Sequence, residues 1–286
     1  MGMLPNRRIW TWFEGTWQEG NVPIMGSADH GTWLGTLVFD GARAFDGVTP
    51  DLDLHCARVN HSAVVMGLKP TMATGAIVEL AREGVAKFPA DAAIYIRPMY
   101  WSREGGPTSV DPVPESTTFA LCLEEASMGA ATGYAVTTTR YTRPTLATNL
   151  TNCKAACLYP NNARMLREAQ EKGFANAIVC DALGNVAETA TSNIFMVRHG
   201  EVFTPVPNGT FLNGITRQRV IRLLREAGYQ VHETTLTLDD FRVADEIFST
   251  GNYSKVVPIV KFDDHEPGPG PVAMKARELY WEWAHG

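Results

Sequence analysis

The chain has 286 residues, of which 45% are hydrophobic, 20% charged and 9% aromatic. This composition is typical of a globular protein with one large or two modest domains, and it excludes a disordered or coiled-coil chain. The 25 lysines and arginines against 31 acidic residues give a net charge of −6 without a run of like charge, so no nucleic acid partner is expected. No segment approaches about 18 uninterrupted apolar residues, which argues against a transmembrane helix and a membrane partner.

The first residues and the cysteines indicate the cellular compartment of the protein. Residues 1–8 carry two arginines and lead into an aromatic stretch rather than an apolar segment with a cleavage site, so we expect no signal peptide. The five cysteines are odd in number and scattered, which indicates reduced thiols and a cytoplasmic location. Cys153 and Cys157 are interpreted as small core residues. No second pair or histidine cluster completes a zinc site, so we expect no metal.

Hydrophobic patterning in the first half predicts a small domain over residues 1–125. Strands are expected at residues 9–13, 36–39, 93–97 and 117–123. Helices are expected at residues 51–68 and 71–88, and within the first of them Leu54, Arg58 and Ser62 share a face by i, i+4 spacing. The stretch that follows the last strand is rich in small residues and shows little periodicity, so we place an interdomain linker at residues 126–133.

The second half predicts a larger domain over residues 134–286. Strands are expected at residues 134–139, 177–180 and 245–249, and as a hairpin at residues 193–197 and 201–203. Helices are expected at residues 163–172 and 213–227, each closed by a glycine, and a loop is expected at residues 266–271. The mixture of elements indicates an α+β protein with mixed sheets in two domains.

Two charged residues have surroundings that suit chemistry. Lys154 lies between small and apolar residues, where burial would lower the pKa of its amine and make it a usable nucleophile. The simpler alternative is an exposed lysine at a helix start. Glu188 lies between a strand and a run of small hydroxyl residues, where a pocket would pair it with a buried cation; the simpler alternative is a surface acid. Each residue alone fits the simpler alternative better.

Three further features suit a phosphate group. Gly214 and Thr216 lie at a predicted helix start, where backbone donors can bind an anion, although simple N-capping explains the pattern as well. The turn at residues 250–252 offers a second set of donors, or it is a polar loop after a strand. Arg58 offers a charge to the same group, although a single arginine is more often solvated.

Six segments, in this order, resemble one family. They resemble its opening strand and its Val-Phe-Glu-Gly-x-Arg, His-x-x-Arg, Lys-Ala-Gly-Gly-Asn-Tyr, Glu-x-x-x-x-Asn-Leu/Ile-Phe and Leu-Pro-Gly-Ile-Thr-Arg motifs, at residues 12–15, 38–43, 55–58, 154–159, 184–195 and 212–217. The family is the class IV aminotransferases, the fold-type IV pyridoxal 5'-phosphate (PLP) group that includes the branched-chain and D-amino-acid aminotransferases. The resemblance covers nearly the whole chain and implies a two-domain, fold-type IV PLP enzyme.

The resemblance implies roles for the matching residues. Lys154 matches the Schiff-base lysine, which also carries a proton between the substrate's α-carbon and the cofactor's C4′. Glu188 matches the carboxylate at the pyridine nitrogen, and Tyr159 matches the tyrosine at the phenolic oxygen. The residues that match the phosphate site are Arg58, Ile215, Thr216 and, from the turn, Thr250 and Gly251.

The resemblance also implies a reaction, which is transamination between a hydrophobic or branched-chain L-amino acid and 2-oxoglutarate. Substrate-facing residues are expected at Phe39, Gly41, Arg43, Tyr95, Arg97, Thr191 and Asn252. Arg97, which shares a strand face with Tyr95, ranks before Arg43 as the residue that binds the second carboxylate of 2-oxoglutarate; the alternative is an arginine paired with a structural acid. In the family the site lies between domains and a neighbouring subunit helps to close it, so we expect a homodimer or larger homo-oligomer.

Departures from the family's pattern leave the substrate open. Leu34 stands where branched-chain enzymes show a pocket tyrosine, residues 156–158 replace Gly-Gly-Asn, and residues 99–114 lack the usual glycine-valine pattern. Pro160 suits the start of a helix rather than its interior. The alternatives are a D-amino-acid or (R)-amine transaminase, a PLP lyase of the aminodeoxychorismate lyase type, and a non-catalytic module. The last is disfavoured because a scaffold needs neither the lysine nor the glutamate.

Overall fold

The computed structural model describes residues 7–286, so the prediction for residues 1–8 lies almost wholly outside the described part. The chain forms two compact units. The first unit runs to Met128 and includes Asn152–Cys157, and the second comprises Gly129–Thr151 and Leu158–Gly286. We expected residues 152–157 in the large domain, and this part of the prediction is wrong. The segment bonds to a strand and a helix of the first unit, as the next subsection describes.

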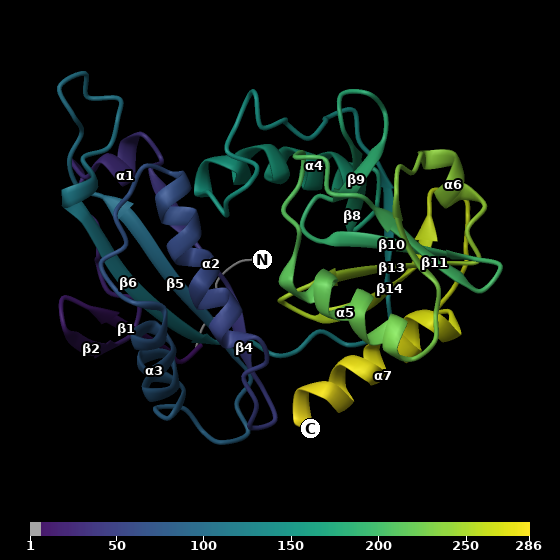
Figure 1. Ribbon diagram of the computed structural model, residues 1–286, viewed down its shortest axis with the longest axis horizontal. Helices are drawn as coiled ribbons and strands as arrows, with labels where there is room; N and C mark the ends of the chain where they lie inside the picture. Colours follow the sequence, from purple (N-terminus) through teal and green to yellow (C-terminus); the bar gives the residue numbers. More distant parts are fainter. Residues whose placement is uncertain (1–6) are drawn as a thin grey trace. The chain divides into compact units, whose positions relative to one another are not determined.

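The first unit is built on an antiparallel sheet (Figure 1). Its strands, in spatial order, are β2 (Thr16–Glu19), β1 (Ile9–Phe13), β6 (Thr117–Glu125), β5 (Ile94–Ser102) and β3 (Leu37–Phe39), and β4 (Ala42–Ala44) also pairs with β5. Three helices contact β5, namely α1 (His30–Trp33), α2 (Leu52–Val65) and α3 (Thr74–Val85). Ile94 and Ile96 are buried, whereas Tyr95 and Arg97 on the opposite face are half-buried. One face of β5 therefore belongs to the core, and the strand extends beyond its predicted end.

The helix α2 buries one of its faces. Its buried residues are Leu52, His55, Cys56, Val59, Ser62 and Ala63. Leu54 is 44% exposed, whereas Ser62, on the face predicted from their i, i+4 spacing, is fully buried. The buried positions recur with the i, i+3, i+4 spacing of one helical face, which turns residue 54 toward the solvent.

The second unit is built on a mixed sheet in the order β12, β11, β10, β13, β14, β7, β8 and β9. These strands are β7 (Tyr134–Thr138), β8 (Asn176–Cys180), β9 (Val186–Thr189), β10 (Asn193–Arg198), β11 (Glu201–Pro205), β12 (Val231–Thr234), β13 (Glu246–Gly251) and β14 (Lys255–Phe262). The helices are α4 (Tyr159–Glu171), α5 (Ile215–Glu226), α6 (Leu238–Arg242) and α7 (Pro271–His285). Phe195 of β10 and Phe248 of β13 stack with ring centroids 4.8 Å apart, and α5 and α7 pack against this part of the sheet (Figure 1).

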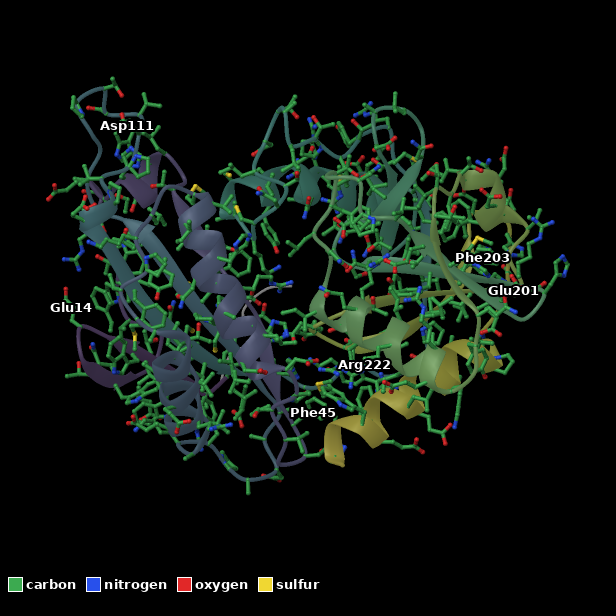
Figure 2. The ribbon with its side chains drawn as sticks, in the orientation of Figure 1. Glu14, Phe45, Asp111, Glu201, Phe203 and Arg222 are labelled. Atoms are coloured by element: carbon green, nitrogen blue, oxygen red, sulfur yellow. The ribbon has the colours of Figure 1, made fainter. Side chains whose placement is uncertain are left out.

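Polar contacts stabilise one edge of this sheet. The strand β11 pairs antiparallel with β10, which confirms the predicted hairpin, and parallel with β12. Glu201 and Phe203 lie two residues apart on β11 (Figure 2). The His232 ring of β12 stacks on Phe203 with centroids 4.9 Å apart, and its Nε2 lies 2.9 Å from the Glu201 carboxylate. These cross-strand contacts support the register between β11 and β12.

Two long elements of the second unit, β14 and α7, were not predicted. Pro258 interrupts the hydrophobic pattern of β14, yet this residue pairs with β13. The helix α7 begins at Pro271, the last residue of the predicted loop, and the N–H groups of Val272 and Ala273 donate to the buried Glu246 carboxylate (3.1 and 2.9 Å). The group that caps α7 lies far earlier in the sequence. The local signal is Pro271 at the first helical position, which the prediction assigned to the loop.

The cysteines differ in their environments. All five are free thiols. Cys153 is buried as predicted, but Cys157 is exposed, so its prediction as a core residue is wrong. Burial raises the pKa of Cys153 to about 12, so this thiol is protonated at neutral pH. Among residues 7–286, no helix is both long and apolar enough to cross a membrane.

Candidate active site

Lys154 is fixed to the first unit through its backbone. Its N–H donates to the Ser62 hydroxyl of α2 (3.1 Å), and its carbonyl accepts the Phe39 N–H of β3 (3.1 Å). Ala155 continues this contact in an isolated bridge with Val38. The Lys154 side chain is partly buried, and its Nζ lies 4.9 Å from the centre of the Phe39 ring. The backbone is thus held at two points, and the amine lies over an aromatic face.

Arg58 is held by a fully buried carboxylate. Its Nε and Nη2 donate to the two carboxylate oxygens of Asp40 (2.6 and 2.8 Å), a forked pair that fixes the plane of the guanidinium. Asp40 also contacts His55 Nδ1 and accepts the Gly41 N–H, both at 2.7 Å. Burial alone would raise the pKa of Asp40, but the charge of Arg58 and the hydrogen bonds from Arg58 and His55 outweigh it and hold this pKa well below its usual range. Asp40 is therefore a charged group that orients Arg58.

Tyr95 and Arg97 share the half-buried face of β5, as the alternation of a strand predicts. The Arg97 guanidinium carbon lies 5.0 Å from the centre of the Tyr95 ring. Arg97 Nη2 donates to Glu124 of β6 (2.6 Å), so the structure contains the ion pair considered above as the structural alternative. A Cβ at Gly41 would lie 2.1 Å from the Tyr95 hydroxyl, so only glycine fits beside this ring.

Three other predicted residues have different surroundings. Arg43 is fully buried in the first unit and donates to the Ala126 carbonyl. Thr191 is exposed in the second unit, and its hydroxyl accepts the Asn176 side-chain amide (2.9 Å). Tyr159 is 38% exposed and is the first residue of α4, which starts earlier than the predicted residue 163. The proline that follows Tyr159 occupies the first turn, as expected for this residue type.

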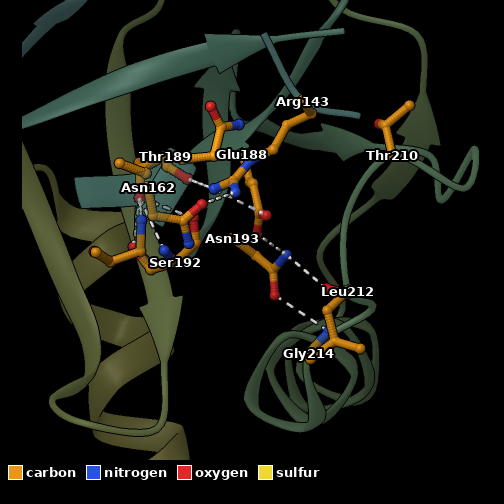
Figure 3. Close-up of polar contacts among 12 residues, drawn as sticks. Arg143, Asn162, Glu188, Thr189, Ser192, Asn193, Thr210, Leu212 and Gly214 are labelled. Atoms are coloured by element: carbon orange, nitrogen blue, oxygen red, sulfur yellow. Dashed lines mark hydrogen bonds and ion pairs between the residues drawn. The ribbon is translucent and has the colours of Figure 1, made fainter. Parts of the chain in front are cut away.

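In the second unit, Glu188 of β9 is held between a cation and an amide (Figure 3). Arg143 Nη2 lies 3.1 Å from Oε1, and Asn193 Nδ2 donates to Oε2 (3.2 Å). Arg143 is itself fixed, because it donates to the Asn162 side chain (2.6 Å) and the Thr189 carbonyl (2.7 Å). The Glu188 and Arg143 side chains are 13% and 7% exposed. Glu188 is therefore paired with a buried cation, and the surface-acid alternative, which its local sequence favoured, is wrong.

Asn193 also connects Glu188 to the start of α5 (Figure 3). Its Nδ2 donates to the Leu212 carbonyl (3.1 Å), and its Oδ1 accepts the Gly214 N–H (3.2 Å). A Cβ at Gly214 would lie 2.2 Å from Asn193 Oδ1, which explains why a glycine precedes the helix. One amide side chain therefore links a nearly buried carboxylate to a helix N-terminus.

The start of α5 presents backbone donors. No side chain of the described part caps this helix, so the N-capping alternative is wrong, and the N–H groups of Ile215 and Thr216 lie at an uncapped N-terminus. The buried Arg217 donates to the Asn213 side chain (2.8 Å) and the Pro205 carbonyl (2.8 Å), and so anchors the first turn to β11. The helix dipole favours a negative group at this position.

The end of β13 and the turn after it add two polar atoms. Thr250 is 1% exposed, and its hydroxyl has no hydrogen-bond partner within residues 7–286. The Nδ2 of Asn252 is likewise buried without a partner in that range. A buried donor without an acceptor is costly. Both atoms, together with the Gly251 backbone between them, therefore fit a bound anion.

Several residues that support the site were not identified from the sequence. Arg143 and Asn193 hold Glu188, and Asp40 holds Arg58. Asn193 and Asp40 lie inside the matched motifs, so a polar residue within such a motif was a usable signal. Arg143 lies in none of the matched segments, and nothing local marked it.

Comparisons with known proteins agree with these features. A family model described as amino-transferase class IV matches residues 37–262. The chain is 31% identical to the branched-chain-amino-acid aminotransferase of Pseudomonas aeruginosa, over 96% of this chain and 92% of that protein. A Brucella abortus aminotransferase solved with bound PLP is 64% identical, with a TM-score of 0.97 and coverage of 98% of this chain and 100% of that one. The Escherichia coli branched-chain amino acid aminotransferase is 26% identical, with a TM-score of 0.90 and coverage of 96% and 94%.

Proposed function

The chain belongs to the class IV aminotransferase family, and we propose that it transfers the amino group of a hydrophobic or branched-chain L-amino acid to 2-oxoglutarate with PLP as cofactor. The expected fold-type IV, α+β architecture is confirmed by its likeness to branched-chain aminotransferases. The proposed substrate class rests on relatives that are named for branched-chain amino acids.

One observation carries the proposal, namely the link from Glu188 through Asn193 to the uncapped start of α5. A carboxylate and a helix N-terminus are the groups that the two ends of PLP need, since PLP has a basic pyridine nitrogen and an anionic phosphate. The buried and unpartnered Thr250 hydroxyl supports the same conclusion, because a phosphate oxygen is a suitable acceptor for it. The residues of the second unit therefore fit PLP.

When bound, PLP supplies an aldehyde carbon that bonds amines and a pyridinium ring that withdraws electrons from the substrate's α-carbon. Glu188 would hold a proton on the pyridine nitrogen, since its carboxylate is an acceptor fixed by Arg143 and Asn193. Lys154 would attach the cofactor and then, as a free amine, move the α-proton of the substrate. The bonds of its backbone to Ser62 and Phe39 restrict the motion to the side chain.

The phosphate site is proposed to combine charge with backbone donors. Arg58 would supply the charge, oriented by its forked pair with Asp40. The N–H groups of Ile215 and Thr216 and the turn at residues 250–252 would supply neutral donors. We also propose that Tyr159 contacts the phenolic oxygen of PLP.

We propose that Arg97 binds the distal carboxylate of 2-oxoglutarate. Its Nη2 is engaged by Glu124, while Nε and Nη1 make no hydrogen bond within residues 7–286, so one edge of the guanidinium is available to a second carboxylate. Arg43 is the second choice, because it is fully buried. The other proposed substrate-facing residues are Phe39, Gly41, Tyr95, Thr191 and Asn252.

The test of the proposal starts with Lys154→Ala and a matched variant at an exposed lysine, Lys172→Ala. Borohydride reduction of the PLP-loaded protein, followed by peptide mapping, should attach the cofactor to the peptide that contains Lys154. The Lys154→Ala variant should lose this attachment and nearly all turnover while it keeps its fold, and Lys172→Ala should match the wild type. Attachment at another lysine would contradict the assignment.

A substrate panel tests the reaction. L-leucine and L-valine with 2-oxoglutarate should give the corresponding 2-oxo acids and glutamate, whereas D-alanine and (R)-1-phenylethylamine should react much more slowly. A preference for the D- or (R)-enantiomers, or release of ammonia without an oxo-acid acceptor, would overturn the proposed substrate class.

We further propose a homodimer or larger homo-oligomer, which light scattering after gel filtration will test. A reducing compartment such as the cytoplasm is consistent with the five free cysteines.

A further inference from the structure

Lys255, the first residue of β14, is an unusual lysine. It is 1% exposed, although lysines are rarely buried without a specific role. Its φ is 61°, in the left-handed region that favours glycine or asparagine after a short hairpin loop. Neither its backbone conformation nor its burial explains a lysine here, so the explanation lies with its ammonium group.

The ammonium fixes the orientation of the Asn252 side chain. Lys255 Nζ donates to Asn252 Oδ1 at 2.7 Å. Because an ammonium group has donors only, the oxygen of the amide must face it and the Nδ2 must point away. That Nδ2 is buried and has no hydrogen-bond partner within residues 7–286, and the same holds for the Thr250 hydroxyl near the end of β13. Two donors that are two residues apart therefore lack an acceptor.

The helix α7 holds this arrangement from behind. Arg277 Nη1 donates to the carbonyls of Ser254 (3.1 Å) and Val256 (2.8 Å), which flank Lys255 in the sequence. The Tyr280 ring of α7 lies with its centroid 5.6 Å from Lys255 Nζ. Figure 1 shows α7 packed beside this part of the sheet. Arg277 thus holds the backbone on both sides of Lys255, and the Tyr280 ring lies beside its ammonium group.

We propose that Lys255 is a positioning residue that orients Asn252 so that its Nδ2 donates to an anionic group bound at the turn. This inference rests on the proposed function, which supplies two such groups, the phosphate of PLP and the carboxylate of the amino acid substrate. A neutral amide is suited to this task, since it bonds the ammonium through one end and the anion through the other.

Two variants test the inference, with Lys275→Met, on the exposed side of α7, as the control. Lys255→Met removes the ammonium that orients the amide. Asn252→Asp keeps an acceptor for Lys255 but replaces both Nδ2 donors with a negative oxygen, so it remains informative where Lys255→Met fails to fold. The affinities of the cofactor-free full chain for PLP, pyridoxal and inorganic phosphate are measured by spectroscopic titration and calorimetry. The KM for L-leucine is measured on the loaded enzyme.

Both variants should weaken the binding of one of the two anions by about 10- to 100-fold, which is the effect of losing a hydrogen bond to a charged group. Weaker binding of PLP and inorganic phosphate with unchanged pyridoxal affinity identifies the phosphate. A higher KM for L-leucine with unchanged PLP affinity identifies the substrate carboxylate. Unchanged values, or equal losses for PLP and pyridoxal, overturn the inference. If the wild-type chain binds inorganic phosphate but not PLP, the proposed function is refuted and the inference is not. In that case, loss of phosphate binding in the two variants still supports the inference. A chain that binds neither refutes both.

Discussion

Substitution of Asn193 tests whether the two ends of the proposed cofactor site are joined by a single side chain. Asn193 is buried, and its amide makes three hydrogen bonds of 3.1 to 3.2 Å, to Glu188, to the Leu212 carbonyl and from the Gly214 N–H. At about 1 kcal/mol for each bond, Asn193→Ala should lower the free energy of unfolding by about 3 kcal/mol. It should also slow the half-reaction with an amino donor by about 10- to 100-fold, because Glu188 loses a donor that fixes its carboxylate.

Asn193→Asp separates the electrostatic part of this effect from the packing part. The introduced carboxyl keeps an acceptor for the Gly214 N–H, but it places a second negative charge next to Glu188. Two carboxylates within hydrogen-bond distance repel each other, which raises the pKa of one of them. As the pH falls, the pair therefore binds one proton, and the protonated carboxyl can again donate a hydrogen bond to the other. The rate deficit of Asn193→Asp relative to the wild type should therefore be largest at high pH and shrink toward pH 5, whereas that of Asn193→Ala should stay constant.

Chemical denaturation and single-turnover kinetics between pH 5 and 8.5 measure both effects. Asn161→Ala, which removes an amide with hydrogen bonds at the surface of α4, serves as the matched control and should cost under about 1 kcal/mol. Wild-type stability together with a wild-type half-reaction rate in Asn193→Ala would refute the reasoning. A deficit of Asn193→Asp that is independent of pH would show that Glu188 does not share a proton with its neighbour.

Four further predictions follow from the same geometry. Glu188→Gln should slow the half-reaction by roughly 10² to 10⁴ in single-turnover experiments and weaken PLP binding far less, and an unchanged rate would remove this residue from the chemistry. Arg97→Ala should raise the KM for 2-oxoglutarate sharply and that for L-leucine little; equal increases would indicate that its ion pair on β6 is only structural. Asp40→Asn should cost about 3 kcal/mol of unfolding free energy, since it leaves the largely buried Arg58 guanidinium without a compensating charge. Because the pKa of Asp40 is lowered in the folded chain, this difference should be constant above about pH 4 and shrink at lower pH, as denaturation measured against pH will show. Glu246→Gln should lower the melting temperature by several degrees through loss of the charge at the N-terminus of α7, and unchanged melting would contradict that role.

The elements that could be predicted are those whose signal is local. The strand at residues 9–13 and the helix at residues 213–227 have a run of strand-forming aromatic residues and an apolar helical face, respectively, and the structure contains both as β1 and α5. The helix α7 was missed because Pro271, its first residue, was assigned to the loop, and the group that caps it, Glu246, comes from another strand. The exposure of Cys157 was missed for a related reason, since burial depends on which face the neighbouring elements cover.

The candidate site shows the same limit. Short motifs contain Lys154, Glu188 and Arg58, because a motif is a local pattern of residue types. The groups that fix them come from distant segments: Ser62 for Lys154 and Arg143 for Glu188. Contacts between segments that are distant in the sequence depend on the pairing of strands and the docking of loops, which a single sequence does not specify.

The two acids of the matched motifs illustrate what the structure adds to the sequence. Asp40 and Glu188 each lie next to an arginine, so the sequence pattern and the pairing alone would give them the same role. Asp40 is completely buried and accepts hydrogen bonds from Arg58, His55 and Gly41, so it can act on a ligand only through the partly exposed Arg58. Glu188 keeps 13% of its side chain exposed beside a fixed arginine, so its carboxylate can meet a ligand directly. Burial therefore separates the acid that positions another residue from the acid that we propose to act on the cofactor.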